Sequence, residues 1–258
     1  MKKLVFLIHG IALRSDIKIL KYWGKIPDLI NSYGFETHTL QVDAFGSITE
    51  NVRMIKDEIR KKITVGGYGE IHVIGHSKGG VEAYKLLNEK EISPFITSLV
   101  LLNSPLCGQI FAKNFLLKLP SKHSSFYRFL NFIGKIEGDK NPDSYETLKE
   151  LSIDHLDIAV SRNVKVYVLQ SCLEYSGLSP YWKLLSRISY GKTLTGDGMV
   201  EYQSIGVRNF IIILPEQLTD KPLTHNSVTG LPRWIAQSKV DYMDLWRSLI
   251  RLTLISIN

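Results

Sequence analysis

Short apolar runs alternate along the chain with segments whose apolar residues recur at helical spacing. Residues 4–8 form a continuous apolar run, which is typical of a strand buried on both faces of a sheet. Residues 48–63 instead place Val52, Ile55 and Ile59 on one face of a helix. Further strands are predicted at 35–42, 71–74, 96–102, 164–169 and 210–214, and further helices at 20–33, 81–87 and 240–257. This alternation predicts an α/β fold with a mostly parallel central sheet and helices on both faces.

Residues 108–160 interrupt the alternation, because they contain no clear strand. Aromatic and aliphatic residues are spaced there among polar and basic ones, with Pro120 and Gly134 as breaks. The pattern predicts two or three short amphipathic helices inserted into a single domain that spans residues 1–258. Two compatible interpretations remain open, a packed helical subdomain and a lid whose apolar face covers an acyl-binding site.

Composition narrows the class of protein. Of 258 residues, 44% are hydrophobic and 22% are charged, as in ordinary soluble globular proteins, and no apolar run reaches the roughly 18 residues of a membrane span. The net charge of +7 comes from scattered lysines and arginines rather than from a basic block. We therefore expect no nucleic-acid partner. A solvated basic surface is the main interpretation of the charge, and attraction to acidic lipid is the alternative.

The cysteines and the first residues bear on localisation. Cys107 and Cys172 are too few for a disulfide framework, which fits a reducing compartment. The start of the chain imitates a signal peptide, but its apolar run is only five residues long before His9, and a secretory segment needs about seven. We expect a cytoplasmic protein, or one exported without a cleaved signal peptide.

Ser77 stands at the centre of a Gly-x-Ser-x-Gly match between Gly75 and Gly79. The predicted strand over 72–74 precedes it and a helical segment over 80–87 follows it, which is the context of a nucleophile elbow. A serine on such a tight turn has strained backbone angles, and larger side chains two residues away would clash. The sequence therefore predicts a nucleophilic serine supported by two glycines.

A nucleophilic serine needs a base, and in this kind of fold the base follows the last strand. Of the seven histidines, only His225 comes after the predicted strand at 210–214. His225 is therefore the predicted base.

The base needs an acid that orients it, placed before it in the chain. Asp197 is preferred, because its flanking glycines place it on a turn with an apolar stretch beyond. Glu201 is the fallback. The remaining carboxylates are expected to be solvated: Glu174, Glu216 and Asp220.

An oxyanion hole needs two backbone N–H groups aimed at the developing charge. Lys78, directly after the nucleophile, supplies one. The loop after the first strand supplies the other, because Gly10 allows close approach and the N–H of Ile11 follows it. We expect the side chain of His9 to brace this loop rather than to act as a base.

At this point the sequence resembles the α/β-hydrolase superfamily and, within it, the bacterial triacylglycerol lipases of the pseudomonad type. Ordered stretches carry the likeness: VFLIHGIA, YWGKIPDLINSYGFETHTLQV, HVIGHSKGGVEAYKL, LVLLNSPLCGQ, DSYETLKELSIDHLDIAV and TGDGMVEYQS. The resemblance implies a serine esterase or lipase with a mobile lid. It also implies a Ser77, Asp197, His225 triad, with the Ile11 and Lys78 amides as oxyanion donors.

The chain also departs from these lipases, which hold a structural calcium near the base through two aspartates. One aspartate would lie upstream of the acid, where residues 175–196 contain no Asp or Glu. The other would stand two positions after the base, at Ser227. Because Ca²⁺ needs several oxygen ligands, we predict no calcium, and the sequence indicates no other cofactor. Lys78 replaces the usual His or Gln, and Leu106 stands where His is common.

These observations together predict a serine hydrolase that cleaves carboxylic esters of acyl lipids through an acyl-enzyme, as a triacylglycerol lipase-like enzyme does. The partners expected are a lipid or small-ester substrate and a membrane or lipid surface contacted peripherally through the lid. A thioesterase or acyltransferase using the same triad is the first alternative. An inactive scaffold that binds lipid or a partner is the second.

Overall fold

A six-stranded sheet in which all neighbouring strands are parallel forms the centre of the molecule, in the order β4-β1-β5-β6-β7-β8. The computed structural model describes residues 2–11, 16–17, 20–158, 163–174, 178–190, 195–203, 210–236 and 238–255. The strands of the sheet are β1 (Lys2–Ile8), β4 (Glu36–Thr39), β5 (Tyr68–His76), β6 (Ile96–Leu102), β7 (Lys165–Leu169) and β8 (Phe210–Ile213). β2 (Asp16–Ile17) and β3 (Leu20–Lys21) form a separate antiparallel pair. The predicted parallel sheet is confirmed.

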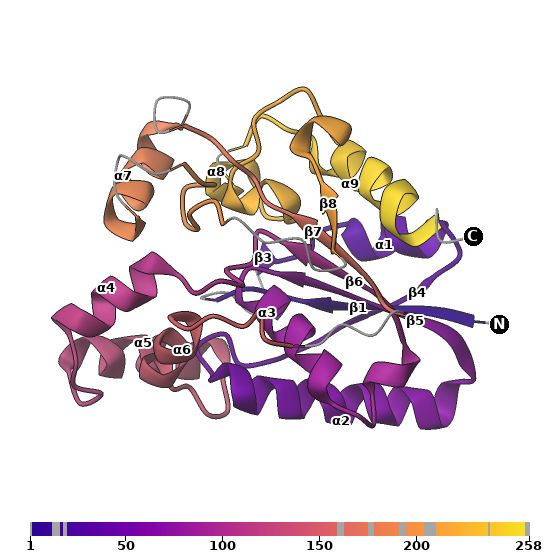
Figure 1. The fold of residues 1–258 in the computed structure, drawn as a ribbon, viewed down its shortest axis with the longest axis horizontal. Helices are drawn as coiled ribbons and strands as arrows, with labels where there is room; N and C mark the ends of the chain where they lie inside the picture. The colour runs from indigo at the N-terminus through magenta and orange to yellow at the C-terminus, as the bar shows by residue number, and fades with distance from the viewer. Residues whose placement is uncertain are drawn as a thin grey trace.

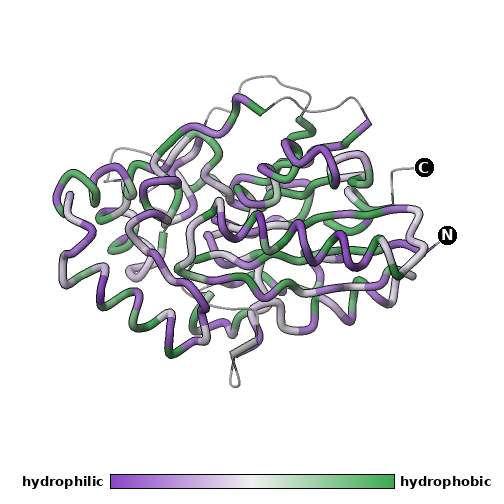
Figure 2. Tube along the Cα trace, turned by 90° about the horizontal axis from the view of Figure 1, so that it is seen from below, coloured by the Kyte–Doolittle hydropathy of each residue, from purple (hydrophilic) through white to green (hydrophobic). Residues whose placement is uncertain are grey.

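Helices lie on both faces of the sheet, which is why residues 4–8 of β1, near its centre, are continuously apolar and fully buried (Figure 1). Along β1, Leu4 and Phe6 point into one core and Val5 and Leu7 into the other. Figure 2, seen from the side of α2, shows the alternating polar and apolar residues of that helix in front of the sheet. The covering helices are α2 (Ile48–Gly66) and α3 (Lys78–Lys85) on one face, and α1 (Ile26–Ser32) and α9 (Tyr242–Ile250) on the other.

A helical insert lies between β6 and β7, at the carboxyl ends of the strands (Figure 1). It contains α4 (Ile110–Lys118), α5 (Ser125–Glu137) and α6 (Ser144–Leu151), as the break in alternation predicted. Residues 159–160, at the end of the predicted insert, lie outside the described residues. Two helices that the sequence pattern did not predict, α7 (Pro180–Ser189) and α8 (Arg233–Ala236), lie further along the chain.

The helix predicted over 20–33 is wrong in its first half. Gly24 takes a positive φ of 50° in a turn before α1, so the helix begins only at Ile26. The apolar residues Tyr22 and Trp23 are buried, but they lie in that turn. The helical spacing between Trp23 and the apolar residues of α1 therefore reflects burial and not a continuous helix.

The last predicted helix, over 240–257, is present and begins where Asp241 accepts a hydrogen bond from the Met243 amide at 2.9 Å. It passes into a π-helical turn at Arg251–Ile255, and residues 256–257 are not described. Within the described ranges, none of the helices combines the length and apolar character needed to cross a bilayer. Both cysteines are free.

Candidate active site

Ser77 stands between β5 and α3 with φ 56° and ψ −123°, a backbone conformation that side-chain-bearing residues rarely adopt. Glycines on either side allow the turn to be this tight. A Cβ on Gly75 would lie 2.3 Å from the Gly79 carbonyl oxygen, and a Cβ on Gly79 would lie 2.3 Å from the His9 carbonyl oxygen. The strained strand-to-helix turn predicted for Ser77 is therefore present, and the serine is almost fully buried.

The loop after β1 packs directly against this turn. A Cβ on Gly10 would lie 3.0 Å from the Cβ of Ser77. The Gly10 amide donates to the Tyr22 hydroxyl at 3.0 Å, so the next amide along the loop, that of Ile11, is the better candidate for an oxyanion donor. Lys78 begins α3, and the first amides of a helix have no intrahelical acceptor. Both expected oxyanion donors thus lie on segments that border Ser77.

The ring of His9 is buried under this loop. Its Nδ1 lies 2.8 Å from the Gly10 carbonyl oxygen and its Nε2 lies 3.1 Å from the Val42 carbonyl oxygen. These contacts join the loop to the chain that follows β4. The bracing position expected for His9 agrees with this geometry.

His225 and Asp197 form a buried pair. His225 Nδ1 lies 2.7 Å from Asp197 Oδ2, and the His225 amide donates to the Asp197 carbonyl oxygen at 2.8 Å. The other carboxylate oxygen accepts the amides of Met199 and Val200 at 2.9 and 2.8 Å, which fixes the orientation of the carboxylate. Because Nδ1 donates to the acid, Nε2 keeps the lone pair that a general base requires.

The other acidic candidates lie away from this pair. Glu201 Oε1 accepts the Ile110 amide at 3.0 Å at the start of α4. Glu216 and Asp220 are exposed. Of the acids whose contacts are described, Asp197 is the one hydrogen-bonded to the histidine.

Three residues that the sequence did not single out hold the backbone of His225 in place. His76 Nε2 donates to the His225 carbonyl oxygen at 2.9 Å, and Asn103 Nδ2 donates to the same oxygen at 3.0 Å. The Tyr22 hydroxyl donates to His76 Nδ1 at 2.5 Å. Burial, and secondarily the nearby His225, hold the pKa of His76 well below its usual range, so the ring is neutral. Asn103 could have been suspected from its place directly after a buried strand.

These contacts bring His76, the residue before Ser77, against the loop that carries His225. The rings of His76 and His225 have centroids 4.7 Å apart. Within the part of the chain that the structure describes, the Ser77 hydroxyl makes no direct hydrogen bond to the His225 ring. Such catalytic hydrogen bonds are often long until substrate binds.

The loop that carries His225 is closed by hydrogen bonds between hydroxyl groups. One of them belongs to Ser227, the position at which the sequence lacks the aspartate of a calcium site. Ser227 Oγ accepts the Thr224 amide at 2.8 Å and donates to Ser238 Oγ at 3.0 Å. Across the described ranges, no group of three or more His, Cys, Asp or Glu side chains could hold a metal ion. The described residues around Ser227 present hydroxyl oxygens, whereas a hard cation requires several carboxylate or carbonyl oxygens.

Two cavities lie near the carboxyl edge of the sheet. One, of about 510 Å³, is bounded by α4 and α7 and includes Phe115, Leu184 and Tyr190. Tyr190 connects it to the acid-bearing turn, because its hydroxyl accepts the Gly198 amide at 3.1 Å. The other, of about 810 Å³, is lined by β7, β8 and the loop beyond β8. Ser77, Asp197 and His225 line neither of these two cavities.

Comparison with solved structures identifies the architecture. The metagenomic carboxyl esterase MGS0156 superposes with a TM-score of 0.73 at 15% identity, over 97% of this chain and 75% of that chain. The mature form of the Bacillus licheniformis lipase BlEst2 gives a TM-score of 0.53 at 14% identity, over 87% of this chain and 85% of that chain. The sequence matches no protein-family model and no curated protein at a significant level. At these identities the likeness establishes the fold, which is the α/β-hydrolase fold.

Proposed function

We propose that this protein is a serine hydrolase that cleaves carboxylic esters, with Ser77 as nucleophile, His225 as base and Asp197 as the acid that orients the base. The observation that carries the proposal is the strained φ of 56° at Ser77, together with a buried histidine–carboxylate pair that has an Nδ1–Oδ2 distance of 2.7 Å and whose histidine is hydrogen-bonded to the residue before Ser77. Backbone strain of this kind persists where the surrounding structure holds it, and it clusters at functional sites.

The chemistry follows from the roles of these groups. His225 Nε2 takes the hydroxyl proton as Ser77 Oγ attacks the ester carbonyl carbon. The Ile11 and Lys78 amides stabilise the oxyanion, and each such donor contributes about 10²–10³ in rate. The alkoxide leaves with the proton from His225. Water, activated by the same ring, then hydrolyses the acyl-enzyme and frees the acid. Asp197 stabilises the imidazolium that forms in both steps.

An acyl-lipid substrate is supported by the cavity between α4 and α7, whose lining includes the apolar side chains of Phe115, Leu184 and Ile188. Burial of each methylene of an acyl chain is worth about 0.8 kcal/mol. The insert in this proposal is a lid over that site. A triacylglycerol lipase-like preference for long chains is the finer form of the proposal, and the names of the structural neighbours include both an esterase and a lipase.

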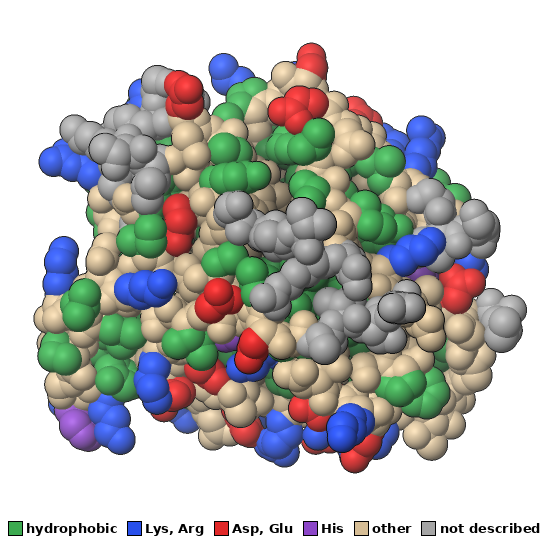
Figure 3. Space-filling view, in the orientation of Figure 1, with side chains coloured by type: hydrophobic (Ala, Val, Ile, Leu, Met, Phe, Trp, Pro, Cys, Tyr) green, Lys and Arg blue, Asp and Glu red, His purple; other side chains and the backbone are tan. Residues whose placement is uncertain are grey.

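Peripheral contact with a lipid surface is supported by the outer face of the insert. Leu117, Phe129 and Ile136 on α4 and α5 are exposed although they are apolar. Figure 3 shows apolar side chains beside basic ones over this part of the surface. Apolar groups that enter a membrane interface beside cations that attract acidic headgroups are typical of peripheral binding. A cytoplasmic location, or export without a cleaved signal peptide, remains part of the proposal.

A thioesterase or acyltransferase would use the same triad, with a thioester as substrate or an alcohol in place of water. A scaffold that binds lipid or a partner without catalysis would not require the strain at Ser77. The base–acid pair favours an enzyme over that scaffold.

The test is a series of p-nitrophenyl esters from acetate to palmitate, run beside acyl-CoA thioesters and with and without EDTA. We expect ester hydrolysis, labelling of Ser77 by a fluorophosphonate, and loss of both in Ser77→Ala. Activity is expected to be unchanged by EDTA, because no metal site is proposed. Hydrolysis of thioesters alone would favour the thioesterase. Absence of labelling together with absence of turnover would favour the scaffold, and strong inhibition by EDTA would contradict the metal-free site.

A further inference from the structure

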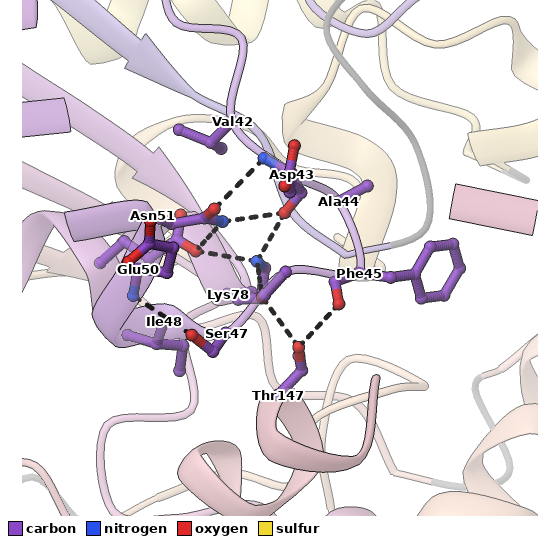
Figure 4. A network of polar contacts seen from close by, with 12 residues as sticks. Val42, Asp43, Ala44, Phe45, Ser47, Ile48, Glu50, Asn51, Lys78 and Thr147 are labelled. Carbon is purple, nitrogen blue, oxygen red and sulfur yellow. Dashed lines mark hydrogen bonds and ion pairs between the residues drawn. The ribbon is translucent and has the colours of Figure 1, made fainter. Parts of the chain in front are cut away.

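We propose that the side chain of Lys78 is a positioning group for the oxyanion hole, acting by tethering the start of α3 to residues 42–46, which we call the anchor loop. This inference rests on the proposed serine-hydrolase function. Lys78 contributes to that chemistry through its backbone amide, whereas its charged side chain points the other way, into the protein (Figure 4).

The Lys78 ammonium is fully buried and each of its three N–H groups has an acceptor. Nζ lies 2.9 Å from the Asp43 carbonyl oxygen and 2.8 Å from that of Gly46. The third acceptor is Glu82 Oε1 at 2.8 Å, one helical turn along α3. An ammonium has three donors and no acceptor, so this arrangement satisfies it completely. Two of its three bonds reach the anchor loop, more than 30 residues away in sequence.

Asn51 ties the same groups together from α2. Its Nδ2 donates to Glu82 Oε1 at 2.7 Å and to the Asp43 carbonyl oxygen at 2.8 Å. Its Oδ1 accepts the Asp43 amide at 3.2 Å. The dashed lines of Figure 4 trace this closed set of contacts around the Lys78 ammonium. The anchor loop and α3 are therefore joined through specific polar geometry.

Burial of an ion pair costs free energy, because both charged groups lose their hydration. Burial raises the pKa of Glu82 above its usual range, against the opposing effect of the Lys78 ammonium. An apolar pair of similar volume is often neutral or stabilising by comparison. Stability alone therefore gives no reason for Lys78 and Glu82, whereas fixing the position of a backbone segment does.

The anchor loop also holds the second oxyanion peptide. His9 Nε2 lies 3.1 Å from the Val42 carbonyl oxygen, and His9 Nδ1 lies 2.8 Å from the Gly10 carbonyl oxygen. The Lys78 peptide is thus hydrogen-bonded to the anchor loop through its own side chain, and the Gly10–Ile11 peptide contacts that loop through the buried His9 ring, which as a neutral imidazole donates to one of the two carbonyl oxygens. Their relative position depends on that loop.

Residues of the helical insert also hold the anchor loop. Asp139 accepts the amides of Ala44 and Phe45 at 2.9 and 2.8 Å. The Thr147 hydroxyl lies 2.8 Å from the Gly46 carbonyl oxygen. Lys78 therefore hydrogen-bonds the start of α3 to a loop that the insert also holds in position.

The expected effect of breaking the tether follows from the geometry of oxyanion stabilisation. A donor must lie within about 2.7–3.1 Å of the developing oxyanion, and a misplacement of about 1 Å can cost 10² in rate. Because the charge develops only in the transition state, kcat falls while KM changes little. A role in stability alone would lower the melting temperature and leave kcat unchanged.

The test compares wild type with Lys78→Met combined with Glu82→Gln, which removes the tether without leaving a buried unpaired charge. We expect kcat on a chromogenic ester and the rate of fluorophosphonate labelling each to fall about 10–100-fold, with KM within about threefold. Thr253→Val is the matched control, because it removes a buried hydroxyl whose hydrogen bond, to the Leu249 carbonyl oxygen at 2.8 Å, lies outside both the anchor loop and α3. It is expected to lower the melting temperature and to keep kcat within about threefold.

If the double variant fails to fold, Lys78→Gln with Glu82→Gln takes its place, since an amide keeps part of the hydrogen bonding. It is expected to lower kcat by a smaller factor with KM again nearly constant. The inference is overturned if a folded double variant keeps wild-type kcat, or if Thr253→Val lowers kcat as much as the double variant does. Wild type that neither turns over ester nor labels would instead overturn the proposed function.

Discussion

The ring of His76 is hydrogen-bonded to the backbone of His225, with Nε2 2.9 Å from the carbonyl oxygen, although the two residues are 149 positions apart in sequence. This bond joins the residue before the nucleophile to the residue proposed as its base. The opposite ring nitrogen accepts the Tyr22 hydroxyl, which in turn accepts the Gly10 amide. The neutral ring of His76 thus connects three segments: the loop after β1 that contains Gly10, the turn at Ser77, and the loop that carries His225.

Removing the Tyr22 hydroxyl would break this chain of hydrogen bonds at its centre. Tyr22→Phe leaves both the Gly10 amide and His76 Nδ1 buried without their partner, at a cost of about 1–3 kcal/mol for each unsatisfied group. We expect a lower melting temperature and a kcat/KM reduced about 10–100-fold. Ester kinetics and thermal unfolding measure the two effects. Tyr33→Phe, at the partly exposed end of α1, is the control, and equal effects of the two substitutions would contradict the prediction.

The strain at Ser77 predicts a gain in stability when glycine replaces it. A residue with φ 56° and ψ −123° stores roughly 1–3 kcal/mol of backbone strain, part of which is offset by the greater freedom of glycine in the unfolded chain. Ser77→Gly is expected to be about 1 kcal/mol more stable than Ser77→Ala in denaturant unfolding, and both are expected to be inactive. A Ser77→Gly protein less stable than Ser77→Ala would argue against strain at this position.

The hydrogen bond between Asp197 and His225 predicts which carboxylate matters for turnover. Asp197→Asn can present its amide N–H to His225 Nδ1, which favours the wrong tautomer, so we expect kcat to fall about 10²–10⁴-fold. Glu201→Gln is the matched control, because an amide oxygen can still accept the Ile110 N–H. Steady-state kinetics should leave that control within about threefold of wild type. A larger loss in Glu201→Gln than in Asp197→Asn would reverse the assignment of the acid.

His72 predicts how stability depends on pH. Burial lowers the pKa of His72 from 6.5 to about 4, against a weaker opposing effect of Glu70. Because the unfolded chain binds this proton more readily, the stabilisation is complete above about pH 6.5 and is lost as pH falls toward 4. Between pH 7 and 5 the loss for this one group is about 2 kcal/mol.

His72→Gln removes this titrating group. The fall in unfolding free energy between pH 7 and 5 should therefore be about 2 kcal/mol smaller in the variant than in wild type. Urea unfolding at several pH values measures the slope. His123→Gln, on the exposed surface, should leave the slope of wild type unchanged. An identical slope in His72→Gln and wild type would show that His72 is not the group responsible.

Local pattern was sufficient for the six strands of the central sheet and for the elbow. Continuous apolar runs marked β1 and β6, and the two glycines around Ser77 marked a tight turn before any contact was known. These features depend on residues within a few positions of each other, where backbone geometry acts directly. The proposed base could also be chosen from chain order, since only His225 follows the last strand.

Other features depend on contacts between segments distant in sequence, and local pattern carries little information about them. Asp197 and Glu201 are both buried acids on one turn, and only the packing of that turn against the loop that carries the base places Asp197 beside His225. The side chain of Lys78 had no explanation in sequence, because its acceptors at Asp43 and Gly46 lie on another loop. Parallel strands bring their carboxyl ends to one edge of the sheet, and hydrogen bonds across that edge decide which of the available polar groups meet.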